Sequence, residues 1–163
     1  MLTRLAWARN GTPDTRTTQG TDLDITDMTA KLFNQIIIHT VGTGSFGGYV
    51  HFNDDTANNY AYRFSTDGAA DSTAINIGLL NTVIQDNAQF IIVNAFSVAN
   101  EEKLVSLQLI DSNNAGAANA PFREELAGKY VPSPDADITG TDCNDIFGGN
   151  YVAGANISAL GTD

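Results

Sequence analysis

Short runs of alternating apolar and polar residues dominate the chain, and turn-forming residues separate them. Residues 32–41 are rich in β-branched side chains, which predicts a strand. Residues 60–65 place three aromatic side chains on one face and small or polar residues on the other, and we expect the aromatic face to point into the core. Residues 22–28 alternate in the same way, which predicts a further half-buried strand.

The strongest predicted strand, residues 89–98, is apolar on both faces. Residues 100–102 read as a turn, and residues 103–110 return with their aliphatic side chains on one side. This pair predicts an antiparallel hairpin. Apolar residues on both faces predict a central strand, covered on one side by a facing sheet and on the other by a loop or a subunit.

The pattern does not decide the secondary structure of two segments. Residues 75–86 fit a short strand or a helical turn, while residues 122–131 contain a helix-compatible run but fit a strand better in their hairpin context. The whole pattern predicts about eight to ten short strands with frequent turns and no amphipathic helix. We therefore expect an all-β, antiparallel, jelly-roll-like β-sandwich over residues 22–163, preceded by an N-terminal arm and loop over residues 1–21.

The composition of the chain limits the classes of partner that it can bind. The chain has 163 residues, enough for one domain with its own core, and only 17% of them are charged. Its net charge is −11, which disfavours binding to nucleic acid and to anionic membranes. No stretch has the roughly 18 apolar residues of a membrane span, and no signal-peptide pattern is visible. We expect synthesis and assembly in the cytoplasm.

The N-terminal segment, residues 1–21, is basic although the chain as a whole is acidic. This segment contains three basic residues, Arg4, Arg9 and Arg16, and a single acidic residue, Asp14. Trp7 lies between Arg4 and Arg9 in the sequence. Such a segment predicts an arm that docks on an acidic neighbouring protein. The simpler interpretation is three solvated arginine side chains.

Few residues suggest catalysis. Cys143 is the only cysteine, so neither an intramolecular disulfide nor a multi-cysteine metal site can form. A nucleophilic Cys143 would need a histidine base, but His39 and His51 lie far upstream in predicted strands. Neither histidine has a further metal ligand nearby in sequence. We expect no catalytic residue, no metal and no cofactor, and thus not an enzyme.

Several tyrosines offer an alternative function. Tyr49, Tyr60 and Tyr151 are candidates for an aromatic platform that contacts glycans, as in a carbohydrate-binding module. The competing interpretation is that these side chains pack in the core.

Four sequence blocks also carry a family resemblance: residues 50–65, 101–104, 119–129 and 154–161. They resemble small virion-associated proteins of tailed phages and archaeal viruses, with Tyr130 where that family usually has Trp. The resemblance implies a β-sandwich on the exterior of the virion, as a capsid decoration or a head or tail appendage. We expect such a subunit to form a homo-oligomer, a trimer first, that docks on the major capsid protein or other virion proteins; the alternative is a carbohydrate-binding module on a tail or fibre that recognises a host surface.

Overall fold

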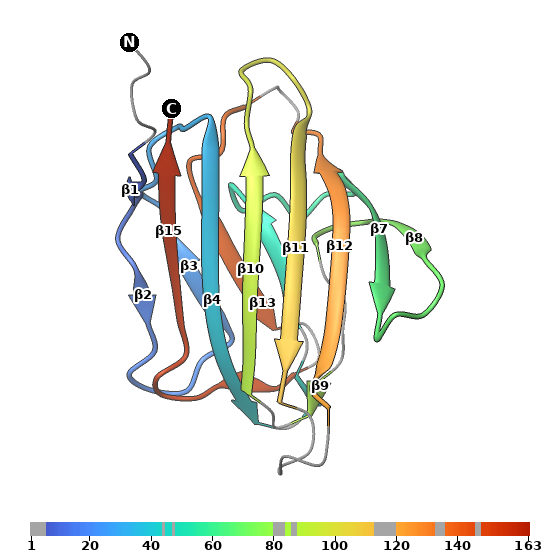
Figure 1. Ribbon diagram of the computed structural model, residues 1–163. Helices are drawn as coiled ribbons and strands as arrows, with labels where there is room; N and C mark the ends of the chain where they lie inside the picture. The colour runs from blue at the N-terminus through green and yellow to red at the C-terminus, as the bar shows by residue number, and fades with distance from the viewer. Residues whose placement is uncertain are drawn as a thin grey trace.

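The computed structural model describes residues 6–43, 45–46, 48–79, 84–85, 88–112, 120–132, 136–145 and 148–163. Across these residues the regular structure is β, and a ten-stranded sheet packs against a three-stranded sheet (Figure 1). All strand pairs among the described residues are antiparallel. The predicted all-β antiparallel sandwich is confirmed. The described residues contain no helix that is long and apolar enough to cross a membrane.

The large sheet contains the longest strands. Its order is β1 (Ala8–Arg9), β15 (Asn156–Thr162), β4 (Phe33–Thr43), β10 (Ala88–Phe96), β11 (Lys103–Asp111), β12 (Phe122–Tyr130), β7 (Tyr60–Thr66) and β8 (Ser72–Asn76). Two further short strands join it: β2 (Asp14–Thr15) pairs with β15, and β14 (Asn150–Tyr151) pairs with β4. The predicted hairpin is β10 and β11, and the segment with helical character is strand β12.

The small sheet has the order β3 (Asp22–Ile25), β13 (Thr141–Asp145) and β6 (Gly48–Phe52), and β5 (Ser45–Phe46) pairs with β9 (Ile84–Gln85) separately. Ten of the strands in the described residues have four or more residues, which agrees with the expected number. A jelly roll divides eight strands between two sheets. Here the division between the two packed sheets is ten against three.

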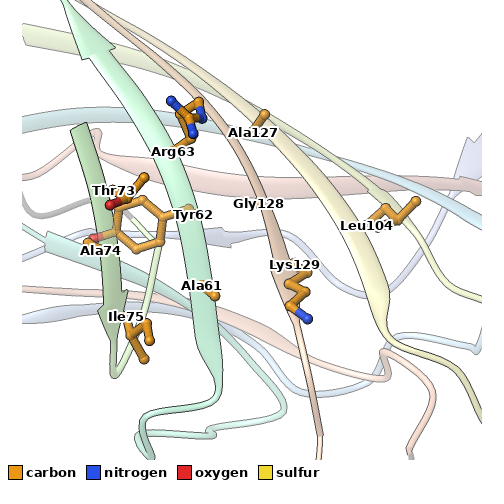
Figure 2. Close-up of a pocket in the computed structure, with 10 residues that line it drawn as sticks. All are labelled: Ala61, Tyr62, Arg63, Thr73, Ala74, Ile75, Leu104, Ala127, Gly128 and Lys129. Carbon is orange, nitrogen blue, oxygen red and sulfur yellow. The ribbon is translucent and has the colours of Figure 1, made fainter. Parts of the chain in front are cut away.

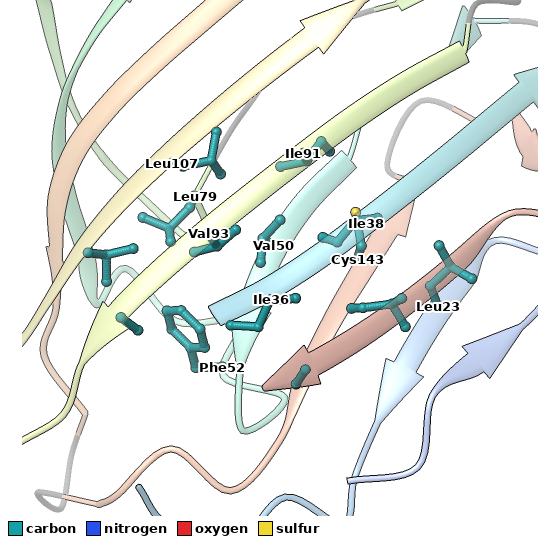
Figure 3. Close-up of a cluster of buried hydrophobic side chains, with 14 of the residues drawn as sticks. Leu23, Ile36, Ile38, Val50, Phe52, Leu79, Ile91, Val93, Leu107 and Cys143 are labelled. Carbon is teal, nitrogen blue, oxygen red and sulfur yellow. The ribbon is translucent and has the colours of Figure 1, made fainter. Parts of the chain in front are cut away.

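The core lies between the two sheets. Alternate residues of each strand point inward, and Figure 3 shows where the two layers meet. Inward-facing members of the core include Ile36, Ile38, Ile91, Val93 and Leu107 from the large sheet and Val50, Phe52 and Cys143 from the small one. The aromatic face predicted for residues 60–65 does point into this core. Each fully buried aliphatic side chain contributes about 2 kcal/mol to stability.

The N-terminal segment is an edge of the large sheet. Ala8 and Arg9 pair with β15, as do the two residues of β2. Asn10 is buried, and its Nδ2 donates to Asn34 Oδ1 at 3.0 Å. These contacts satisfy backbone groups along the edge of β15. Residues 8–9 and 14–15 of the expected N-terminal arm therefore pair with the large sheet.

The segment left open in the sequence, residues 75–86, begins as a strand. Its first two residues complete β8, and Leu79 then forms a bridge with Val50 at the edge of the small sheet. Residues 80–83 and 86–87 lie outside the described residues. The strand interpretation thus holds for the start of the segment.

Candidate functional site

Four adjacent strands of the large sheet present an outer face without Asp, Glu, Lys or Arg. Every second residue of β15, β4, β10 and β11 points away from the core. We call this set the uncharged face; its members are Phe33, Gln35, Ile37, His39, Val41, Thr43, Ala88, Phe90, Ile92, Asn94, Phe96, Leu104, Ser106, Gln108, Ile110, Asn156, Ser158 and Leu160. In Figure 1 the large sheet lies in front of β3 and β13, so this face is turned toward the viewer. In a chain of net charge −11 its composition is a local exception.

Apolar side chains form one cross-strand row at an end of this face. Phe96 lies opposite Phe33 on one side and Leu104 on the other. The Phe33 and Phe96 ring centroids are 5.0 Å apart, and the rings are tilted by 44°. Leu104 is 58% exposed although it is a large hydrophobic residue. This row is therefore apolar surface that the chain itself leaves open to water.

A polar row follows directly. Gln35 Nε2 donates to Asn94 Oδ1 at 2.9 Å, and Asn94 Nδ2 donates to Ser106 Oγ at 3.5 Å. The three residues lie opposite one another on β4, β10 and β11. The side chains of this row carry no charge, and each amide makes part of its hydrogen bonds within the row. Both properties lower the free-energy cost of removing the row from water.

Further along the strands the face becomes apolar again. Phe90 lies opposite His39 on β4 and Ile110 on β11, and Ile92 lies opposite Ile37. Phe90 is 42% exposed and Ile110 is 50% exposed. Apolar residues of β4 and β10 thus flank the polar row on both sides, and the row of Ile92 and Ile37 continues into Gln108 on β11 and Ser158 on β15.

Charged residues begin on the next strands, β12, β7 and β8, and they occur as ion pairs. Arg63 lies 3.5 Å from Asp71, and the Lys129 ammonium lies 2.8 Å from Glu102. Arg123 and Glu125 form a similar pair at 3.4 Å. These pairs are exposed, so each contributes little to stability. They border the uncharged face without giving it a net charge.

A shallow trough of about 770 Å³ lies over these strands (Figure 2). Ala61, Ala127 and Gly128 form its low floor, while Leu104 and Ile75 stand on opposite sides. Because Leu104 also belongs to the uncharged face, the trough extends the apolar surface beyond β11. The two cations that line the trough, on β7 and β12, are already paired with carboxylates.

The opposite side of the molecule is acidic. On the outer face of the small sheet, Asp24 lies opposite Asp142. Burial raises the pKa of the Asp24 carboxyl, and the carboxylates of Asp54, Asp142, Asp22 and Asp14 raise it further. Within the described residues, no group of three or more His, Cys, Asp or Glu side chains is placed to hold a metal ion. The protein therefore has an uncharged side and an acidic side.

His51 and Asp142 form a buried pair on the small sheet. His51 Nδ1 lies 2.6 Å from Asp142 Oδ1, and the side chains are 2% and 5% exposed. His51 Nε2 is buried and has no hydrogen-bond partner among the described residues. A Cβ on Gly78 would lie only 2.9 Å from that nitrogen, so the Gly78 backbone covers it. A histidine used as a general base needs access to a substrate proton, and this ring is enclosed.

Cys143 is enclosed as well. Its side chain lies in the core, and burial raises the pKa of the thiol to about 12. Tyr151 Oη donates a hydrogen bond to Cys143 Sγ at 3.1 Å. The reactive form of cysteine is the thiolate, so a raised pKa and burial both oppose a nucleophilic role. His39 lies on the opposite, outer face of the large sheet and is exposed.

The residues expected to dock on a neighbour have different surroundings. Trp7 is 49% exposed, and Arg9 is exposed on β1. The Arg16 guanidinium donates to the Asp22 carbonyl oxygen at 3.3 Å and packs over Gly20, so it belongs to the fold. Arg4 lies outside the described residues. Trp7 and Arg9 remain as surface groups.

The three tyrosines that were candidates for glycan contact are all buried in the sandwich, as in the competing interpretation. Tyr49 Oη donates to Asn76 Oδ1 at 3.2 Å, and Tyr151 bonds to the core cysteine. Tyr60 stacks on Tyr130, with ring centroids 4.8 Å apart, and its hydroxyl accepts a hydrogen bond from the Phe52 amide. None of these rings is open to a ligand.

The sequence pattern held one signal for the uncharged face, namely the apolar residues on both sides of residues 89–98. It did not reveal that Leu104 and Ile110 are exposed apolar residues. They occupy the side of residues 103–110 that also holds Ser106 and Gln108, and the alternation predicts a polar side there. Comparisons of the chain with protein-family models, curated proteins and solved structures find no match.

Proposed function

We propose that this chain is a non-enzymatic structural subunit of a virus particle that acts by self-association and by docking on the particle. The observation that carries the proposal is the uncharged face with its exposed Phe90, Leu104 and Ile110. Depletion of charge and exposure of aromatic and aliphatic side chains are typical of interface cores. The resemblance of four sequence blocks to virion-associated proteins supports a particle as the place of assembly.

The energetics favour covering this face. Removing the exposed part of a large apolar side chain from water contributes about 1–2 kcal/mol. No Asp, Glu, Lys or Arg on the face has to be desolvated, which removes the largest cost of burying a surface. The internal hydrogen bonds of the Gln35, Asn94 and Ser106 row lower the cost further. Covering the face is thus favourable for a partner of matching shape.

Docking on the shell of the particle is a separate contact in this proposal. Trp7 and Arg9 lie at the β1 edge of the large sheet, and both are exposed. Trp and Arg are the residue types that most often dominate binding energy at interfaces. Their partner would be an acidic, partly apolar surface of the major capsid protein or another virion protein.

The test uses virus particles whose genome encodes this chain. Mass spectrometry of purified particles should find the chain in a fixed ratio to the shell protein, and antibodies should mark it on the particle surface. Particles lacking the chain should rebind added wild-type protein but not a Trp7→Ala, Arg9→Glu variant, with Thr26→Ala as an exposed control. Absence of the chain from purified particles would overturn the proposal.

A further inference from the structure

We infer that the uncharged face is covered by a second copy of the same chain, packed face to face about a two-fold axis. This inference rests on the proposed function, because it names the partner used for self-association. Three observations support it: the distribution of charge, the size of the face and the order of its rows.

Charge decides how two copies of this acidic chain can approach each other. Contact through the small sheets would bring the Asp14, Asp22, Asp24 and Asp54 carboxylates of the two copies close together, and like charges repel each other. Contact through the uncharged faces instead places those acidic sides at opposite ends of a four-layer stack. With sheets about 10 Å apart, the acidic sides are separated by about 30 Å, well beyond the screening length of about 8 Å at physiological salt.

The size of the face suits a stable dimer. Four strands spaced about 4.8 Å apart, each with about nine residues rising about 3.3 Å, give a flat footprint of roughly 570 Å². The relief of the side chains adds accessible area to this footprint. Stable interfaces bury about 800 Å² per partner, so the face is in the required range.

The order of the rows makes the face complementary to itself. A two-fold axis parallel to the strands keeps each position along the strands and brings every row onto its own copy. The Asn94 row then meets the Asn94 row of the second copy, where free amide groups can exchange hydrogen bonds. The Phe96 row likewise meets its own apolar copy, and Phe90 and Ile110 meet the copy of a row that also contains His39. A charged or strongly polar partner surface would offer no apolar side chains to pack against these rows.

The experiment is sedimentation equilibrium of the full chain, with paired variants. We expect a dimer mass, and Ile110→Asp should weaken dimerisation about a hundredfold, because each dimer would bury two unpaired carboxylates. Ile75→Asp is the matched control: Ile75 is 76% exposed but lies on β8, outside the uncharged face, and its variant should dimerise like the wild type. Circular dichroism checks that both variants fold.

A second pair of variants keeps the test valid if Ile110→Asp does not fold. Asn94→Asp changes charge with almost no change of shape and should also weaken the dimer, whereas Asn58→Asp in an exposed turn should not. A monomer at about 100 μM, a trimer mass, or equal effects of the paired variants would overturn the inference. A trimeric chain found on particles overturns this inference alone, and a dimeric chain absent from particles overturns the proposed function alone.

Discussion

His51 and Asp142 lie directly opposite each other on β6 and β13, and their side chains meet at 2.6 Å with almost no exposure to solvent. Buried polar groups are stable when each provides the other's hydrogen bond. Here the pair joins two strands of the small sheet on the side that faces away from the core. The pair therefore holds the small sheet together, and its removal should be visible in stability.

Asp142→Ala should lower the free energy of unfolding by about 3 kcal/mol, because it leaves a buried His51 without its partner. Urea denaturation at neutral pH measures the change. Asp71→Ala is the control, since Asp71 and its partner Arg63 are both exposed; that change should cost less than about 1 kcal/mol. Equal losses for the two variants would contradict the structural role of the buried pair.

Gly78→Ala should destabilise the protein by about 2 kcal/mol or more. A Cβ at this position would lie 2.6 Å from Tyr49 Cβ and 2.9 Å from His51 Cδ2, and these side chains have no room to move. Gly148→Ala is the comparison: its surroundings are open, and only its positive φ opposes a side chain, at about 1 kcal/mol. Thermal denaturation of both variants ranks them, and a larger loss at Gly148 would refute the packing argument.

Stability should fall at alkaline pH. Burial raises the pKa of Tyr60 and Tyr130 above the ordinary value near 10, so both stay protonated in the native state while the unfolded chain ionises. The native state then holds more protons than the unfolded state, and the free energy of unfolding decreases as pH rises above about 10. The stabilising effect is fully present below that pH.

Urea denaturation between pH 8 and pH 11 tests this dependence. Tyr60→Phe removes one of the two groups, so its stability should fall less steeply with pH, after an initial loss from its hydrogen bond to the Phe52 amide. A variant curve parallel to that of the wild type would show that Tyr60 ionises at its ordinary pKa.

Cys143 should resist thiol reagents in the native protein. Burial raises its pKa to about 12, so at pH 8 very little thiolate exists and none is accessible. Labelling with a chromogenic disulfide should be slow in buffer and complete in denaturant. A Ser72→Cys variant supplies an exposed thiol on β8 as the control for reagent activity, and equal labelling of both thiols would contradict the buried assignment.

Local pattern was enough to predict the central elements of the fold. Residues 89–98 and 103–110 form the hairpin β10–β11 because a turn joins two apolar strands that are close in sequence. The inward aromatic face of β7 followed from strict alternation. The sequence could not show that β6 and β7, joined by a short turn, lie in different sheets, since their partners β13 and β12 come from distant segments.

The candidate site was less predictable for a similar reason. Tyr49, Tyr60 and Tyr151 have the composition of a binding platform, and only the packing of two sheets shows that they are buried. The uncharged face arises from alternate residues of four strands far apart in sequence. No window of the chain contains it, so its absence of charge appears only after the strands are aligned.

Strand β15 lies between β4 and the short strands β1 and β2 (Figure 1). Until the ribosome has released residues 156–162, the nascent chain therefore has an open edge on β4 and no place for residues 8–15 to pair. Open strand edges recruit other extended chains. Productive folding of this sheet must thus follow synthesis of β15, and we expect the unfinished chain to depend on chaperones that cover its edge.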